Sequence, residues 1–383
     1  MRKIVTAIAS LAVALSAVGL APAAQASTAG TTWTSQTSAA NNFWQSVTYG
    51  NGIFVAVGRS GTSTTNGVMT SPDGVTWTTR TSTAANSWGS VTFGNGLFVA
   101  VAGDGGPNQV MTSPDGITWT PRASAANYIW QSVTYGNGLF VAVSYRIGAQ
   151  AGTVMTSPDG ATWTLRNSAT NNTWFDVTYG NGLFVAVGGS GAGTEVMTSP
   201  DGITWTSRAS ASPSIWNSVT YGSGLFVAVS ASNTGQDVMT SPDGVNWTTS
   251  STASGRYWLS VTYGGGLFVA VGDATTPSVA MTSPDGITWT LRSIPTVNQW
   301  TGVTYANGLF VAVAESGNEN RVMTSGVFAA ASSSSPIPMW MQSIGRDSAT
   351  ASCPAGYAGS WAAWPNGGKG GYVCDKFVRV YGS

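Results

Sequence analysis

The chain has 383 residues, of which only 8% are charged, and it contains two cysteines and no histidine. Histidine is the commonest general base and metal ligand, so its absence excludes histidine-based triads and the usual zinc sites, and we expect no metal or cofactor. The 15 basic side chains only balance the 15 acidic ones, so no basic face is available for phosphate backbones and a nucleic-acid partner is not expected.

The first 26 residues are predicted to be a Sec-type signal peptide. Arg2 and Lys3 precede an apolar stretch over residues 4–20, and Ala24-Gln25-Ala26 forms a small-residue cleavage site, which is the order that export signals share. A membrane anchor is the alternative, but this run is short, and no other stretch approaches the roughly 18 apolar residues of a spanning helix. We therefore expect cleavage after Ala26 and a secreted, monomeric protein without a membrane span.

A unit of about 42 residues then recurs along the chain. The segment Trp-x-Ser-Val-Thr-Tyr-Gly-Asn-Gly-Leu-Phe-Val-Ala-Val occurs seven times with small changes, and Met-Thr-Ser-Pro-Asp-Gly-x-x-Trp-Thr occurs six times. In the first unit the pattern predicts strands over 44–49, 53–57, 68–71 and 75–80, joined by an Asn-Gly hairpin and a Pro-Asp-Gly turn. Four antiparallel strands per 40–45 residues is the period of a β-propeller.

The two ends of the repeat indicate how the ring closes. The seventh unit begins at Trp300 and stops at Ser325, without the Pro-Asp-Gly turn or a fourth strand. A matching fragment, residues 31–35 around Trp33, precedes the first complete unit. The sequence therefore predicts an all-β, seven-bladed propeller of four-stranded antiparallel blades over residues 27–328, closed by its N-terminal strand.

The recurring Ser-Pro-Asp-Gly-x-Thr-Trp segment resembles the Asp-box of the bacterial neuraminidase repeat, found in sialidase-like propellers. Aspartate and glycine are contiguous here, whereas one residue separates them in the usual box. The resemblance implies the fold rather than an activity, and it implies that the aspartates stabilise turns on the rim, with calcium binding as the alternative. These structural aspartates are Asp73, Asp115, Asp159, Asp201, Asp243 and Asp285.

Sialidase activity would also require three arginines gathered on the axis and a tyrosine paired with a glutamate. The arginines of the repeat instead recur at one position after the fourth predicted strand, which indicates a role at the blade edge. They are Arg80, Arg122, Arg166, Arg208 and Arg292.

Each connection between blades ends in a tryptophan, and two roles are open for these seven side chains. An exposed ring would stack on a sugar, as in a multivalent lectin, but a tryptophan present in every copy favours a wedge between blades. The variable aromatic and basic residues nearby are therefore the predicted ligand contacts. They are Phe43, Tyr128, Tyr145, Arg146, Arg256 and Tyr257.

The acidic residues of the propeller outside the turns are few. A pair of them across the axis would suffice to hydrolyse a glycosidic bond, but solvated loop charge is the favoured interpretation. They are Asp104, Asp176, Glu195, Asp237, Asp273, Glu315 and Glu319.

The C-terminal region differs from the repeat. Residues 329–338 form a Ser/Pro linker, and residues 339–383 form a small module with Cys353 and Cys374. In an exported protein two cysteines are expected to form a disulfide. A module of about 45 residues also needs such a crosslink to be stable, because its hydrophobic core is small. Its aromatic residues either bind glycan or only pack the module.

Taken together, these features favour a secreted, non-catalytic binding propeller that recognises an extracellular glycan or a protein surface. A carbohydrate-active hydrolase of sialidase-like architecture is the first alternative. A purely structural extracellular scaffold is the second.

Overall fold

The computed structural model describes residues 29–59, 66–145, 153–189, 193–232, 235–250, 256–273 and 279–328, together with the backbone of two strands in the C-terminal region. The chain divides into two compact units, residues 1–330 and 331–383. The predicted signal peptide lies outside the described residues. No helix in the described part has the length and apolarity needed to span a membrane.

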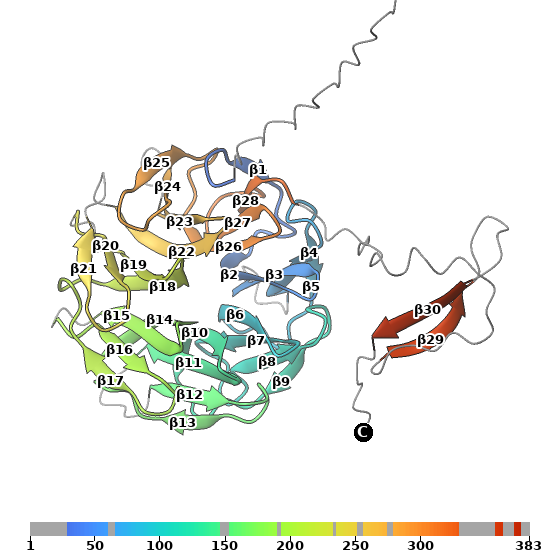
Figure 1. Cartoon of the computed structure of the whole chain (residues 1–383), viewed down its shortest axis with the longest axis horizontal. Helices are drawn as coiled ribbons and strands as arrows, with labels where there is room; N and C mark the ends of the chain where they lie inside the picture. Colours follow the sequence, from blue (N-terminus) through green and yellow to red (C-terminus); the bar gives the residue numbers. More distant parts are fainter. Residues whose placement is uncertain are drawn as a thin grey trace, which may run out of the picture. The chain divides into compact units, whose positions relative to one another are not determined.

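The first unit is a ring of four-stranded antiparallel sheets, and the described residues form seven of them (Figure 1). Blades 1 to 6 use four consecutive strands each, from β2–β5 to β22–β25, and blade 7 combines β26, β27 and β28 with β1. The seven-bladed architecture expected from the repeat is therefore confirmed.

In each blade the first strand is innermost and contacts the first strands of both neighbours. The innermost strands are β2 (Phe43–Gly50), β6 (Trp88–Gly94), β10 (Ile129–Gly136), β14 (Thr173–Gly180), β18 (Trp216–Gly222), β22 (Trp258–Gly264) and β26 (Trp300–Ala306). The second strands are β3 (Ile53–Arg59), β7 (Leu97–Ala102), β11 (Leu139–Tyr145), β15 (Leu183–Gly189), β19 (Leu225–Ser230), β23 (Leu267–Gly272) and β27 (Leu309–Ala314).

The third and fourth strands complete each blade toward the rim. The third strands are β4 (Val68–Ser71), β8 (Val110–Ser113), β12 (Val154–Ser157), β16 (Val196–Ser199), β20 (Val238–Ser241), β24 (Val279–Ser283) and β28 (Val322–Gly326). The outer strands are β5 (Thr78–Arg80), β9 (Thr120–Arg122), β13 (Thr164–Arg166), β17 (Thr206–Arg208), β21 (Thr248–Ser250), β25 (Thr290–Ser293) and, in blade 7, β1 (Thr34–Gln36).

The outer strand is shorter than predicted, because it begins at Thr78 rather than at residue 75. The Asp73 carboxylate accepts the backbone N–H groups of Val75 and Thr76 at 2.9 and 2.8 Å. Those two N–H groups are thus used by the turn and are not available for strand pairing.

The hydrophobic core lies between the blades. Trp88 of blade 2, for example, is fully buried in one cluster with Val55 and Val57 of blade 1 and with Phe98 of its own blade. Such packing explains why the second strand is apolar on both faces, since each blade is covered by two neighbours. All seven tryptophans at the start of the innermost strands are at most 1% exposed.

The N-terminal strand closes the ring. β1 pairs with β28 in the antiparallel register Thr34↔Thr324, Ser35↔Met323 and Gln36↔Val322. The N–H of Gly30 donates to Ser325 Oγ at 2.7 Å, and the indole N–H of Trp33 donates to the Gly30 carbonyl at 3.2 Å.

The corresponding bonds in blade 1 are Gly74 N–H to Ser71 Oγ at 2.8 Å and Trp77 Nε1–H to the Gly74 carbonyl at 2.9 Å. The closing turn is therefore the repeated turn divided between two chain segments, with Ser325 supplied from one segment and Gly30 and Trp33 from the other.

The second unit is described only as a hairpin of β29 (Tyr357–Ala362) and β30 (Gly371–Lys376). Cys353 and the side chain of Cys374 lie outside the described residues, so the predicted disulfide stays a prediction.

Candidate functional site

Each innermost strand carries a β-bulge at the residue after its tryptophan. In β2, Trp44 pairs with Gly58 and Ser46 pairs with Val57, so Gln45 has no partner across the strand pair. A bulge re-aims the side chain of its extra residue, and here that residue lines the central channel. The seven bulge residues are Gln45, Gly89, Gln131, Phe175, Asn217, Leu259 and Thr301.

In five blades the residue after the bulge is a serine that joins neighbouring blades, whereas blade 4 has Asp176 and blade 7 has Gly302 at this position. Ser46 Oγ accepts the N–H of Val91 from the next blade at 3.2 Å, and Ser90 Oγ accepts that of Val133 at 3.2 Å. The same bond recurs at Ser218 and Ser260. These hydroxyls join the blades around the channel, so the recurring serine is structural, whereas the residue before it varies from blade to blade.

Asp176 takes the serine position in blade 4. Its Oδ1 accepts from Ser132 Oγ at 2.7 Å, and its Oδ2 accepts from Ser218 Oγ at 2.9 Å and from the N–H of Val219 at 2.8 Å. Burial raises the pKa of Asp176 even though these hydrogen bonds favour its charged form. The carboxylate therefore connects blades 3, 4 and 5.

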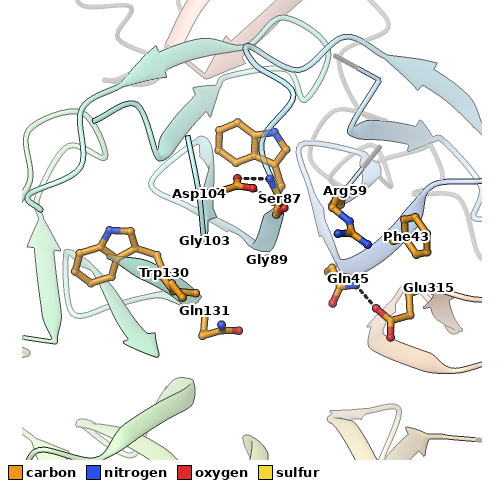
Figure 2. Close-up of a pocket in the computed structure, with 12 residues that line it drawn as sticks. Phe43, Gln45, Arg59, Ser87, Gly89, Gly103, Asp104, Trp130, Gln131 and Glu315 are labelled. Atoms are coloured by element: carbon orange, nitrogen blue, oxygen red, sulfur yellow. Dashed lines mark hydrogen bonds between the residues drawn. The ribbon is translucent and has the colours of Figure 1, made fainter. Parts of the chain in front are cut away.

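A pocket of about 330 Å³ lies beside the channel and shares three bulge residues with it (Figure 2). Its walls come from blades 7, 1, 2 and 3. The lining residues are Phe43, Gln45, Arg59, Ser87, Trp88, Gly89, Gly103, Asp104, Ile129, Trp130, Gln131 and Glu315.

One wall of the pocket is a cation–aromatic cluster. The Arg59 guanidinium, at the end of β3, lies 4.6 Å from the centroid of the Phe43 ring, and the Arg321 guanidinium lies 5.5 Å from it. Arg321 is buried and donates to the backbone carbonyls of Gly317 and Asn42. Arg59 is exposed.

The two carboxylates of the pocket are held by neutral neighbours. Gln45 Nε2 donates to Glu315 Oε2 at 2.7 Å, which joins blades 1 and 7. Asp104 accepts from Ser87 twice, from its N–H at 2.6 Å and from its hydroxyl at 2.8 Å. Figure 2 shows Asp104 and Ser87 on one side of the pocket and Arg59, Phe43 and Glu315 on another.

Of the five predicted ligand contacts that the structure describes, only Phe43 lines this pocket. Tyr128 packs on Trp130, with ring centroids 5.8 Å apart. Tyr145 is 40% exposed and meets the edge of the channel residue Phe175 at 6.1 Å.

The other three predicted contacts lie elsewhere. The backbone N–H of Arg256 donates to Asp237 at 3.4 Å. Tyr257 is 42% exposed, and its carbonyl accepts the N–H of Asp273 at 2.9 Å. Arg146 lies outside the described residues.

The six repeated aspartates all lie in the Ser-Pro-Asp-Gly turns. Asp159, for example, accepts from Ser157 Oγ at 2.9 Å and from the N–H groups of Ala161 and Thr162 at 2.9 and 2.8 Å. The backbone N–H groups lower the pKa of Asp159 and of Asp285 to about 2, and they lower the pKa of the other four as well. Among the described residues no group of three acidic or cysteine side chains is placed to hold a metal ion.

Solvated loop charge is the wrong interpretation for two of the remaining carboxylates. Glu195 and Asp237 are both fully buried. Glu195 accepts from the Gly193 N–H at 2.9 Å and from Ser210 Oγ at 2.5 Å. These side chains connect the loop after the second strand of a blade to the segment that leads to the next blade. The sequence did not predict this role, because the hydrogen-bond partners lie in a different loop.

Comparisons with known proteins identify the fold and no family. No protein-family model matches the chain, and no curated protein matches it. A structure of YCF48 bound to a D1 peptide has a TM-score of 0.57 at 15% identity and covers 78% of this chain and 96% of that one.

Two further structures give similar values. Virginiamycin B lyase from Staphylococcus aureus has a TM-score of 0.65 at 8% identity, with 78% of this chain and 99% of that one covered. YCF48 from Cyanidioschyzon merolae has a TM-score of 0.56 at 12% identity, with 77% and 98% covered. At these identities the likeness concerns the fold alone.

Proposed function

We propose that this protein is an exported, non-catalytic binding propeller, and that a segment of a partner protein docks in the pocket of blades 7, 1, 2 and 3. The observation that carries the proposal is the convergence of non-repeated side chains. Blades of nearly identical sequence present nearly identical surfaces, yet here Phe43, Arg59, Asp104 and Glu315 from three blades meet at one concavity. Concave sites with a few convergent polar groups are the usual form of a binding site.

A protein partner fits the pocket better than a glycan does. Sugar recognition by stacking needs a free aromatic face, but Arg59 covers the Phe43 ring, and the indoles of Trp88 and Trp130 are buried. The carboxamides of Gln45 and Gln131 each carry a donor and an acceptor, which match the N–H and C=O groups of a peptide. The fold neighbour YCF48 was solved with a bound peptide, so a peptide is a known occupant of this architecture.

Glycoside hydrolysis is the second candidate, because Asp104 and Glu315 line the same pocket. Their hydrogen bonds with Ser87 and Gln45 favour a positioning role over proton transfer. Lyase chemistry of the kind named for the other fold neighbour is not proposed either. One solved form of that enzyme is catalytically inactive after a histidine was replaced by alanine, and this chain contains no histidine.

The repeated turns have a scaffold role in this proposal. We regard them as a variant of the Asp-box of sialidase-like propellers, used to fix the rim. A purely structural scaffold is the remaining alternative, but it does not account for a pocket lined by non-repeated residues. Export after cleavage at Ala26 is part of the proposal, and N-terminal sequencing of protein recovered from the medium tests it, since a terminus other than Ser27 contradicts that cleavage site.

The docking proposal is tested with a phage-displayed library of random peptides panned on residues 27–383, beside a glycan array. Gln131→Trp fills the pocket wall at the bulge of blade 3. Leu259→Trp is the matched control, because it places the same side chain at the bulge of blade 6, away from the pocket. We expect selected peptides to bind the wild type and Leu259→Trp and to bind Gln131→Trp at least tenfold more weakly.

Three outcomes contradict the proposal. They are glycan binding without any enriched peptide, equal peptide binding by both tryptophan variants, and turnover of chromogenic glycosides that is lost in Asp104→Asn and Glu315→Gln.

A further inference from the structure

The charges of the pocket are not all matched within the protein. Arg321 is buried, and its carbonyl partners hold the loop of blade 7 against blade 1. Burial lowers the pKa of Arg321, and the charge of nearby Glu315 acts in the opposite direction. Glu315 is therefore a counter-charge for the buried Arg321 within the protein.

Arg59 is different, because its guanidinium is exposed at the pocket wall and forms no ion pair with any described carboxylate. Its position is nevertheless defined, since it lies 4.6 Å from the Phe43 centroid (Figure 2). An arginine stacked on an aromatic face keeps the N–H edges of its planar fork available. Stacking also reduces the rotamer entropy lost when a ligand binds.

We infer, on the basis of the proposed docking function, that the partner segment is a peptide with a carboxylate that binds the guanidinium of Arg59. The planar guanidinium matches a carboxylate through two parallel N–H···O bonds. A phosphate is a poorer match, because Asp104 lines the same pocket and repels a dianion more strongly than a single negative charge.

Asp104 gives the pocket a direction. It lies on blade 2, on another side of the pocket from Arg59 (Figure 2), and among the described residues its oxygens accept hydrogen bonds from Ser87. A ligand with its carboxylate at Arg59 thus meets a negative group elsewhere in the same pocket. The pocket selects for one acidic group at the Arg59 side and against a second one near Asp104.

The test uses peptides enriched by panning, resynthesised in four forms and titrated by fluorescence anisotropy. Acidic side chains are compared with their amide counterparts, and free C-termini with amidated ones, which distinguishes a side-chain carboxylate from a terminal one. We expect one of the two neutralisations to weaken binding about tenfold to a hundredfold, the range of a charge-assisted hydrogen bond. Arg59→Gln should cause a similar loss and remove the difference between the charged and neutral peptides.

Three further variants serve as controls. Arg166→Gln removes a guanidinium from an outer strand, where its Nε donates to Thr156 Oγ1, and should leave affinity unchanged. Asp104→Asn should bind the acidic peptide at least as tightly as the wild type does. Phe43→Leu keeps an apolar side chain but removes the stacking surface, so it should weaken the acidic peptide more than its neutral form.

The result separates this inference from the function on which it rests. If Gln131→Trp abolishes peptide binding while Arg59→Gln and the neutral peptides behave like the wild type, the pocket binds peptides and the carboxylate inference is wrong. If Gln131→Trp binds as well as Leu259→Trp does, the docking proposal itself fails. The inference would also be overturned if Arg166→Gln weakened peptide binding as much as Arg59→Gln does, because the loss of affinity would then follow the net charge of the protein.

Discussion

The closing turn of the ring makes a quantitative prediction at Trp33. This side chain is 7% exposed and belongs to a buried cluster with Val269 of blade 6 and Phe310 of blade 7. An indole buries roughly 200 Å², which at about 25 cal/mol per Å² corresponds to about 5 kcal/mol as an upper limit. Measured replacements of buried aromatic residues by alanine cost about 3–5 kcal/mol. We therefore expect Trp33→Ala to lower the free energy of unfolding by about 4 kcal/mol.

The assay is thermal unfolding of residues 27–383 followed by circular dichroism. A domain of this size loses roughly 2 °C in Tm per kcal/mol, so Trp33→Ala should melt about 8 °C lower. Trp77→Ala, at the same place in an undivided turn, should lose a similar amount. Thr34→Ala is the control, because Thr34 is the next residue and its side chain is exposed.

A Tm for Trp33→Ala within about 1 °C of that of Thr34→Ala would refute the idea that this segment closes the ring. Deletion of residues 27–36 removes β1 altogether and should be more damaging than the point substitution. It leaves the edge of β28 unpaired, so aggregation is expected together with the loss of stability.

Two further predictions concern the ring interior. Burial raises the pKa of Asp176 in the folded state, so its contribution to stability is lost as pH rises above the ordinary value of 3.8 through the raised one. Asp176→Ser, which restores the repeat residue, should therefore raise Tm at pH 7 by about 2 °C and by less at pH 4, and an equal change at both pH values would contradict this assignment. A Cβ at Gly136 would lie 2.1 Å from Tyr179 Cγ, so Gly136→Ala should cost about 2 kcal/mol. Ala306→Gly, at the matching position of blade 7, should change the free energy of unfolding by less than Gly136→Ala does. If urea unfolding shows a larger loss for Ala306→Gly, the clash at Gly136 is relieved in the folded protein and the prediction is wrong.

The blade architecture was predictable because its determinants are local and repeated. Turn residues and strand alternation act over a few positions, and seven copies of one pattern leave little ambiguity. The outer strand was predicted to begin three residues too early, at Val75, because a β-propensity pattern does not reveal that Asp73 captures the backbone N–H groups of Val75 and Thr76.

The pocket was only partly predictable. Phe43 was identified from its aromatic character, but the same criterion also selected Tyr128 and Tyr257, which do not line the pocket. The bulge residues were missed, although one signal was present: the residue after each tryptophan varies within an otherwise constant segment. Arg59 carried no signal, because nothing in the sequence indicates which side chain will lie against it.

The sequence by itself therefore determined the number of blades and the strand that closes them, because the repeat unit and its two complementary fragments can be recognised without knowing any distant contact. Only the tertiary structure showed the pocket in which we propose that a partner segment docks. Gln45 and Glu315 are 270 residues apart in the chain and 2.7 Å apart in space. That contact exists because closure of the ring brings blade 7 against blade 1, and a contact made by closure leaves no local pattern in the sequence.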